Sequence, residues 1–539
     1  MQFALRSKIF HFGRKIRDCV MIRSRLNKYL PSILFVISFV IIFITALIKF
    51  PSNGIEAEFF AEAGANFFYH ARYTPVFKTF LIPEAGYLPL LQRIIAFFVV
   101  TIGGAEANAP FIFQVIALAG ISFFCSFINL HHFKILIPSN IIRFALGLTL
   151  AFFPNFEMFP YINFIYFGFV FLFLLSFYGF RNKSYLTTFL WGLLGLFLIG
   201  SKALLLCIAP YFGLLLLMAV YKNKRKDALV YSMLTLGAIL QSVFCLYVLI
   251  FQSGGVQSSS QKNISQLITM TFDLYLGISV QDFMGYFYLI PSFFFIKIAL
   301  FLTAFLFIPI YFYRINKKQL AFGLFGLQLT SIISLVLFLG LAPVEYYPKL
   351  KIGEFSHPPF FRWYFIAHHS FILTVFILIG NLRSKIMQLI LIALFIYFYP
   401  GYRLFQEQED IYKNKDFSHS QWDSFIPLLK EDAFCIPVNP DPWLIQHNCE
   451  VSNSPEERVV LAVKVNMLNS GMKPEKLILE YSDKSRVDAK NILKDTIYYQ
   501  YWVVEKKEAN IKFHFYNLSG KEIFPNKIVY YSFTPKKSY

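Results

Sequence analysis

Acidic residues are scarce in this chain of 539 residues, which has 31 Asp plus Glu against 50 Lys plus Arg. Only 15% of the residues are charged, whereas 57% are hydrophobic and the mean hydropathy is +0.54. This composition lies outside the range of soluble domains. Uncharged runs such as residues 33–48 and 168–177 fit bilayer spans. The sequence therefore predicts a polytopic α-helical membrane protein.

The sequence also lacks the short motifs of nucleotide and metal sites. It contains no Walker A, GxGxxG or HExxH pattern and no paired-cysteine spacing. We therefore predict no nucleotide site and no structural metal site, and we leave open a divalent cation as cofactor. The net charge of +19 does not predict nucleic-acid binding, because the basic residues form short clusters between hydrophobic runs, where the positive-inside rule places them.

The basic clusters orient the predicted spans. The clusters expected in the cytoplasm are residues 6–28, Arg181/Lys183, 222–226, 314–318 and Arg383/Lys385. With this orientation both ends of segment 87–103 lie outside, so we expect it to lie along the outer interface. About 11 spans remain: 31–49, 109–129, 138–153, 160–180, 184–201, 203–221, 228–251, 290–313, 319–341, 361–380 and 385–400.

Three regions follow from this topology. Residues 1–30 form a basic cytoplasmic N-terminus, residues 31–400 hold the spans and a first outer loop at 50–108, and residues 401–539 lie outside, in a periplasmic or extracellular position. The composition favours a bacterial inner (plasma) membrane.

The C-terminal region changes composition after residue 402 and predicts a β-rich exocytoplasmic domain. Its β-branched or alternating segments are 458–468, 476–481, 496–504, 511–516 and 528–533. Cys435 and Cys449 fall in this region and are disulfide candidates, because an oxidising compartment would allow them to pair. Whether they do pair is left open.

Residues 53–93 of the first outer loop hold four of the few acids, Glu56, Glu58, Glu62 and Glu84. On a helix Glu58 and Glu62 would share a face at i, i+4. A carboxylate near apolar surface has a raised pKa and can act as a general base toward a hydroxyl. The alternative is a solvated acidic loop.

Further polar residues are expected at the outer face. Glu157, with Asn163 nearby, lies between prolines and aromatics and is either a second functional acid or a helix-terminus residue. Arg93, Lys202 and Arg362 are outward cations at bilayer depth, which the positive-inside rule disfavours. Binding the phosphate of an anionic lipid would explain them, and interfacial snorkelling is the alternative.

This layout resembles the GT-C class of membrane glycosyltransferases, which includes oligosaccharyltransferases, protein O-mannosyltransferases and aminoarabinose transferases. The stretch PEAGYLPLLQRIIAFFVVTIGGAEANAPFIFQVIALAG is similar to their Pro-Leu-rich segment, which a Gly-Xaa-Xaa-Glu turn and the second span follow. GSKALLLCIAP resembles their Thr-Lys-Gly…Pro motif, and FRWYF resembles their Arg-Tyr pair. In relatives of the AEDG type the catalytic Asp would fall at Ala63 of AEAG.

The resemblance implies inverting transfer of a hexosyl or pentosyl group from a polyprenyl-phosphate donor to a glycan, lipid or protein acceptor at the outer face. Glu62 or Glu58 would then remove the acceptor proton, or activity has been lost. Lys202, Arg362 and Arg93 would stabilise the leaving phosphate. Glu157 completes the predicted catalytic set, and Tyr87 and Asn163 complete the predicted substrate-binding set. A non-catalytic scaffold, or a lipid or glycan transporter of envelope polysaccharide assembly, is the alternative.

Overall fold

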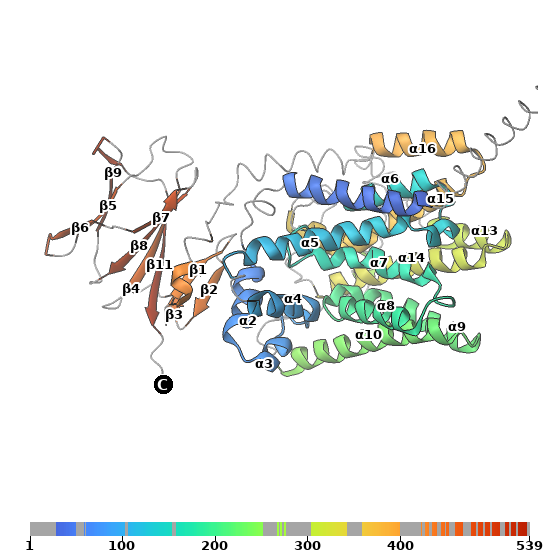
Figure 1. Cartoon of the computed structure of the whole chain (residues 1–539), viewed down its shortest axis with the longest axis horizontal. Helices are drawn as coiled ribbons and strands as arrows, with labels where there is room; N and C mark the ends of the chain where they lie inside the picture. Colours follow the sequence, from blue (N-terminus) through green and yellow to red (C-terminus); the bar gives the residue numbers. More distant parts are fainter. Residues whose placement is uncertain are drawn as a thin grey trace, which may run out of the picture.

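The structure, a computed structural model, describes the helical region except for several connections, together with most strands of the C-terminal region. The described residues are 29–49, 59, 61–102, 106–152, 158–251, 267–268, 270–271, 274–275, 303–341, 358–398, 422, 426–430, 434–438, 443–447, 449–451, 459–466, 476–480, 483–488, 491–495, 499–506, 512–516, 519–523 and 527–535. Figure 1 shows the helices side by side in one bundle, with the strands beyond one of its ends.

Within these residues, five helices are long and apolar enough to cross a membrane, and the chain is a multi-pass membrane protein. They are Tyr29–Lys49, Ala109–Asn129, Ala203–Tyr221, Arg225–Val248 and Lys318–Gly340. Five of the other predicted spans are shorter apolar helices, Asn140–Ala151, Phe164–Tyr178, Tyr185–Ile199, Tyr364–Gly380 and Lys385–Tyr397. The predicted span 290–313 is described only from residue 303.

The α-helices keep the labels of Figure 1. They are α2 (Tyr69–Tyr73), α3 (Val76–Leu81), α4 (Leu90–Thr101), α5 (Ala109–Ser126), α6 (Asn140–Ala151), α7 (Gly168–Tyr178), α8 (Tyr185–Ile199), α9 (Ala209–Tyr221), α10 (Arg225–Phe251), α13 (Ile308–Arg314), α14 (Lys318–Leu341), α15 (Pro358–Gly380) and α16 (Lys385–Phe398). The shorter helices that matter below are the π-helix η2 (Ala63–Phe68) and the 3-10 helices η6 (Phe164–Phe167) and η7 (Ala203–Ile208).

Helix α7 forms the centre of the bundle. All of its 11 residues are buried, as expected for a helix that is apolar on every side. Phe171 of this helix packs against Phe127 of η3 (Phe127–Asn129) and Trp191 of α8, with ring centroids 5.0 and 5.5 Å away. The high phenylalanine content therefore fills the interior with aromatic contacts.

Helices α8 and α10 approach each other closely because glycines line their contact. A Cβ atom added at Gly195 would lie 2.2 Å from Leu234, and one at Gly192 would lie 2.6 Å from Met233. Small residues allow such close approach between membrane helices. Helix α8 begins at Ser184, whose Oγ accepts a hydrogen bond of 3.0 Å from the Thr187 N–H, and ends at Gly200.

Helix α4 is a short apolar helix of the first outer loop. Its 12 residues span about 18 Å, against a hydrocarbon core of about 30 Å. Helix α6, a predicted span, has the same length, so the interfacial position of segment 87–103 stays a prediction. Figure 1 shows α4 beside α2 and α3, at the end of the bundle that faces the strands.

The C-terminal strands are antiparallel. They are β1 (Phe434–Pro437), β2 (Leu444–His447), β3 (Cys449–Val451), β4 (Val459–Asn466), β5 (Lys476–Glu480), β6 (Arg486–Asp488), β7 (Asn491–Asp495), β8 (Tyr499–Lys506), β9 (Lys512–Tyr516), β10 (Glu522–Ile523) and β11 (Lys527–Pro535). The sheet orders are β1-β2, β10-β9-β5-β6 and β3-β11-β4-β8-β7. Strands β4, β5, β8, β9 and β11 overlap the five segments predicted from composition.

The segment before these strands packs onto the first outer loop. The Trp422 ring lies 4.6 Å from the Phe59 ring and 5.3 Å from the Phe68 ring, and its indole N–H donates a 2.8 Å hydrogen bond to the Glu106 carbonyl. In the same way the His447 ring of β2 stacks on Tyr73 of α2 at 4.2 Å. The C-terminal region therefore lies at the same end of the bundle as the first outer loop.

Candidate functional site

The site is organised by a tight turn between α3 and α4. Glu84 and Tyr87 pair through two backbone hydrogen bonds, 2.8 Å from the Glu84 N–H and 3.0 Å from the Tyr87 N–H. The two residues between them, Ala85 and Gly86, both have positive φ, +46° and +84°, as in a two-residue turn of the mirror-image type. The turn therefore holds a carboxyl and a phenol at its two ends.

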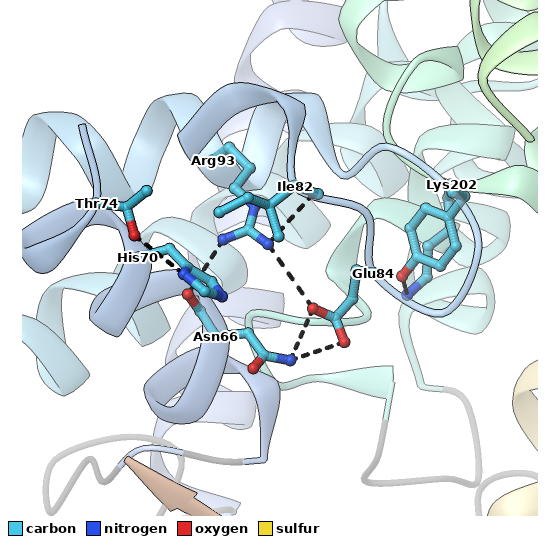
Figure 2. A network of polar contacts seen from close by, with 8 residues as sticks. Asn66, His70, Thr74, Ile82, Glu84, Arg93 and Lys202 are labelled. Atoms are coloured by element: carbon cyan, nitrogen blue, oxygen red, sulfur yellow. Dashed lines mark hydrogen bonds and ion pairs between the residues drawn. The ribbon is translucent and has the colours of Figure 1, made fainter. Parts of the chain in front are cut away.

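On one side of this turn, Glu84 meets a fully buried arginine of α4 (Figure 2). The Arg93 guanidinium donates to the carbonyls of Asn66 and Ile82 at 3.1 and 3.4 Å, and one nitrogen lies 3.9 Å from a Glu84 carboxyl oxygen. The Asn66 amide of η2 donates to both Glu84 oxygens at 2.8 and 2.7 Å. A buried charge requires such compensation, so the contacts fix Glu84 in place.

The surroundings of Glu84 change its protonation. Burial and then the nearby Glu62 charge raise the pKa of Glu84 to about 7, against the lowering effects of Arg93, Asn66 and Lys202. His70 lies beside the same cluster, and burial together with the Arg93 charge lowers its pKa to about 4. At neutral pH the cluster therefore contains a neutral imidazole and a carboxyl near the midpoint of its titration.

Glu62 is the second acid of this cluster. It directly precedes η2, four residues before Asn66, and its side chain is partly buried. One of its carboxyl oxygens is buried and has no hydrogen-bond partner among the described residues. A buried acceptor without a partner is costly in a folded protein, which makes Glu62 a candidate functional group.

Lys202 lies on the other side of the turn. Its ammonium donates to the Tyr87 hydroxyl at 2.7 Å and to the Ile162 carbonyl at 3.1 Å. It also lies 5.0 Å from the centroid of the Tyr87 ring and 5.1 Å from that of the Tyr166 ring. The side chain is 7% exposed, so the aromatic rings shield its charge from solvent.

The sequence around Lys202 also positions α4. The Leu90 N–H lies 3.4 Å from the Gly200 carbonyl, and the Leu91 N–H donates a 2.7 Å hydrogen bond to the Ser201 hydroxyl. These bonds satisfy two N–H groups at the start of α4 that have no partner within the helix. The GSK motif therefore brings Lys202 next to the segment that carries Tyr87 and Arg93.

The structure thus brings four of the predicted site residues together, Glu62, Tyr87, Arg93 and Lys202. Asn163 is 1% exposed and directly follows Ile162, whose carbonyl binds Lys202. Glu58 and Glu157 lie outside the described residues, as does the side chain of Arg362, whose backbone belongs to α15.

The side chains of the two disulfide candidates also lie outside the described residues. The backbone of Cys435 lies in β1 and that of Cys449 in β3. Among the described residues, no three His, Cys, Asp or Glu side chains gather as metal ligands.

Sequence reasoning did not assign roles to Glu84, Asn66 and Ser201. Glu84 is one of the four acids of residues 53–93. The signal that marks it is the Gly86 that follows, because a glycine permits the tight turn that brings Glu84 back toward Arg93. Asn66 and Ser201 act through tertiary contacts with residues 18 and 110 positions away. No local sequence pattern predicts contacts between residues so far apart in the chain.

No family model, no curated protein and no solved structure matches this chain.

Proposed function

We propose that the chain is a GT-C-like membrane glycosyltransferase that transfers a sugar from a polyprenyl-phosphate donor to a cell-envelope acceptor at the outer face of the plasma membrane. The observation that carries the proposal is the buried, unpartnered carboxyl oxygen of Glu62, which lies beside Glu84 and on the same loop as Tyr87, the partner of Lys202. An acid of this loop and a shielded cation that contacts the loop match the needs of a transfer that removes a proton and releases a phosphate.

In the proposed reaction Glu62 is the general base. Its free oxygen takes the proton of the acceptor hydroxyl, and the hydroxyl oxygen attacks C1 of the sugar. The bond from C1 to the phosphate oxygen breaks as the new glycosidic bond forms, the configuration at C1 inverts, and the electron pair leaves with the polyprenyl phosphate. The donor and the acceptor supply every atom of the two products, and the reaction needs no oxidant or reductant.

Lys202 stabilises the leaving phosphate in this proposal. Its ammonium is held by Tyr87 and the Ile162 carbonyl, so the charge is already in place when negative charge develops. Arg93 is a positioning residue, because its guanidinium contacts Asn66, Ile82 and Glu84. The pKa of Glu84 is raised to about 7, so this carboxyl is partly protonated at neutral pH. It therefore repels a charged Glu62 less than a fully ionised carboxylate would.

The same contacts of Arg93 also favour the second candidate, a non-catalytic scaffold. Its guanidinium is fully buried and contacts the Asn66 and Ile82 carbonyls and the Glu84 carboxyl, as in a residue that stabilises the loop. The two candidates differ in whether the free Glu62 oxygen takes part in chemistry.

The deciding experiment measures transfer of a radiolabelled sugar from polyprenyl phosphate to envelope acceptors in membranes that contain the full chain. We expect Glu62→Gln to lower the rate at least about 100-fold, the usual contribution of a general base. Lys202→Gln should lower it by a similar factor. Glu106→Gln, an acid of the same loop that pairs with Arg72, is the matched control and should stay within about threefold. Unchanged transfer in Glu62→Gln and Lys202→Gln would favour the scaffold.

A further inference from the structure

A large cavity opens at the end of the bundle opposite the C-terminal strands. Its volume is about 1050 Å³, large enough for a lipid headgroup and part of an acyl chain. It lies between the α7–α8, α9–α10 and α13–α14 connections, and Figure 1 shows the last two at the end of the bundle away from the strands. The positive-inside rule places this end in the cytoplasm.

The rim of this cavity is strongly basic. It includes six cations and one acid, Asp227; the cations are Arg181, Lys222, Lys224, Arg225, Lys226 and Lys318. They belong to three clusters that are far apart in the sequence. The positive-inside rule explains why each cluster faces the cytoplasm, but it does not require three of them to converge on one cavity.

Part of this charge stabilises the rim itself. Lys226 donates to the carbonyls of Lys183 and Arg181, and Asp227 accepts a 3.0 Å hydrogen bond from the Phe180 N–H and lies 3.9 Å from Lys224. The other four cations have no acid within salt-bridge distance among the described residues; they are Arg181, Lys222, Arg225 and Lys318. An excess of cations therefore remains for an anionic ligand.

Two turns present three of these cations, Lys222, Arg225 and Lys318. After α9 the Lys224 N–H bonds to the Ala219 carbonyl at 2.8 Å, with Asn223 at φ +52°. After α13 the Lys317 N–H bonds to the Phe312 carbonyl at 2.9 Å, with Asn316 at φ +62°. Both turns end a helix at an asparagine in the left-handed conformation. The cations beside them are therefore attached to short, hydrogen-bonded turns.

The walls below the rim are apolar and reach the bilayer side of the protein. Phe177, Leu215 and Phe322 line the cavity together with Tyr185 and Met218. Tyr185 is 60% exposed and Met218 is 37% exposed on the outer surface of the bundle. A cavity with a cationic rim and an apolar wall that continues to the lipid-facing surface fits an amphipathic anion better than a soluble one.

We propose that this cavity binds an anionic phospholipid of the cytoplasmic leaflet, with the phosphate headgroup at the basic rim and an acyl chain against the Phe177, Leu215 and Phe322 wall. The site is separate from the outer loop and does not depend on the proposed sugar transfer.

The test measures binding of dioleoylphosphatidylglycerol and dioleoylphosphatidylcholine to the detergent-solubilised full chain by native mass spectrometry. We expect the anionic lipid to bind at least about tenfold tighter. Lys222→Gln/Arg225→Gln should weaken its binding about 30-fold, at roughly 1 kcal/mol for each charge, and leave the zwitterionic lipid unchanged. The matched control, Arg383→Gln/Lys385→Gln, removes two exposed cations that lie off the cavity and should change binding less than about twofold.

Three results would overturn the proposal. An equal loss of affinity for the anionic lipid in both double variants would show that the net charge of the protein attracts the lipid and that no specific site binds it. Full competition by sn-glycerol 3-phosphate would show that a soluble phosphate is the ligand. The Met218→Trp variant narrows the cavity at its apolar wall and keeps every charge. Unchanged lipid binding in this variant would contradict the proposed position of the acyl chain. That variant also covers the case in which the double variant fails to fold.

Discussion

The buried carboxyl of Glu84 links protonation to stability. Its pKa is raised from 4.5 to about 7 in the folded chain, so the folded chain holds more protons than the unfolded chain between these pH values. The stabilisation is full below about pH 4.5 and is lost as the pH rises through about 7, at up to about 1.4 kcal/mol per pH unit. We therefore expect the Tm of the full chain in detergent to fall as the pH rises across this window.

The Glu84→Gln variant isolates this effect, because an amide cannot titrate. Its Tm should fall less between about pH 5 and pH 7 than that of the natural chain. Glu62→Gln should flatten the profile in part, since the Glu62 charge is the second cause of the raised pKa of Glu84. Three parallel Tm profiles would contradict the assignment of the proton to Glu84.

At the scale of elements, the start of α4 depends on the residues that follow α8. Ser201→Ala removes the acceptor of the Leu91 N–H and should cost about 1 kcal/mol, as loss of a helix cap does. Amide hydrogen exchange in residues 90–93 should become faster. Ser232→Ala is the control, because the Ser232 hydroxyl is exposed and bonds only within its own helix. Unchanged exchange in Ser201→Ala would show that α4 is held by packing alone.

Hydrophobicity and charge predict the elements better than they predict the site. The long apolar helices follow from uncharged runs, because hydrophobicity is a local signal along the chain. The position of Glu62 beside Glu84 depends on how η2 and the turn pack together. The contact of Lys202 with the Ile162 carbonyl links residues 40 positions apart, and composition carries no information about it.

On the scale of the whole molecule, the two ends of the bundle differ in chemistry. The end with the first outer loop carries Glu62 and Glu84 and is covered by the segment that contains Trp422. The other end carries the basic cavity. The positive-inside rule assigns the basic end to the cytoplasm. We therefore expect the protein to have a single orientation in the membrane, with the first outer loop on the opposite side.

Cysteine labelling in intact cells tests that orientation. In a chain whose six native cysteines are replaced, Lys78→Cys of α3 and Lys484→Cys of the strand region should both react with a membrane-impermeant maleimide, since both positions are exposed. Tyr221→Cys at the end of α9, where the side chain is 89% exposed, should react only after the membrane is permeabilised. Because the Trp422 and His447 contacts hold the C-terminal region at the first outer loop, Lys78→Cys and Lys484→Cys must give the same result. Reaction of only one of them in intact cells would contradict that arrangement, and reaction of Tyr221→Cys there would reverse the topology.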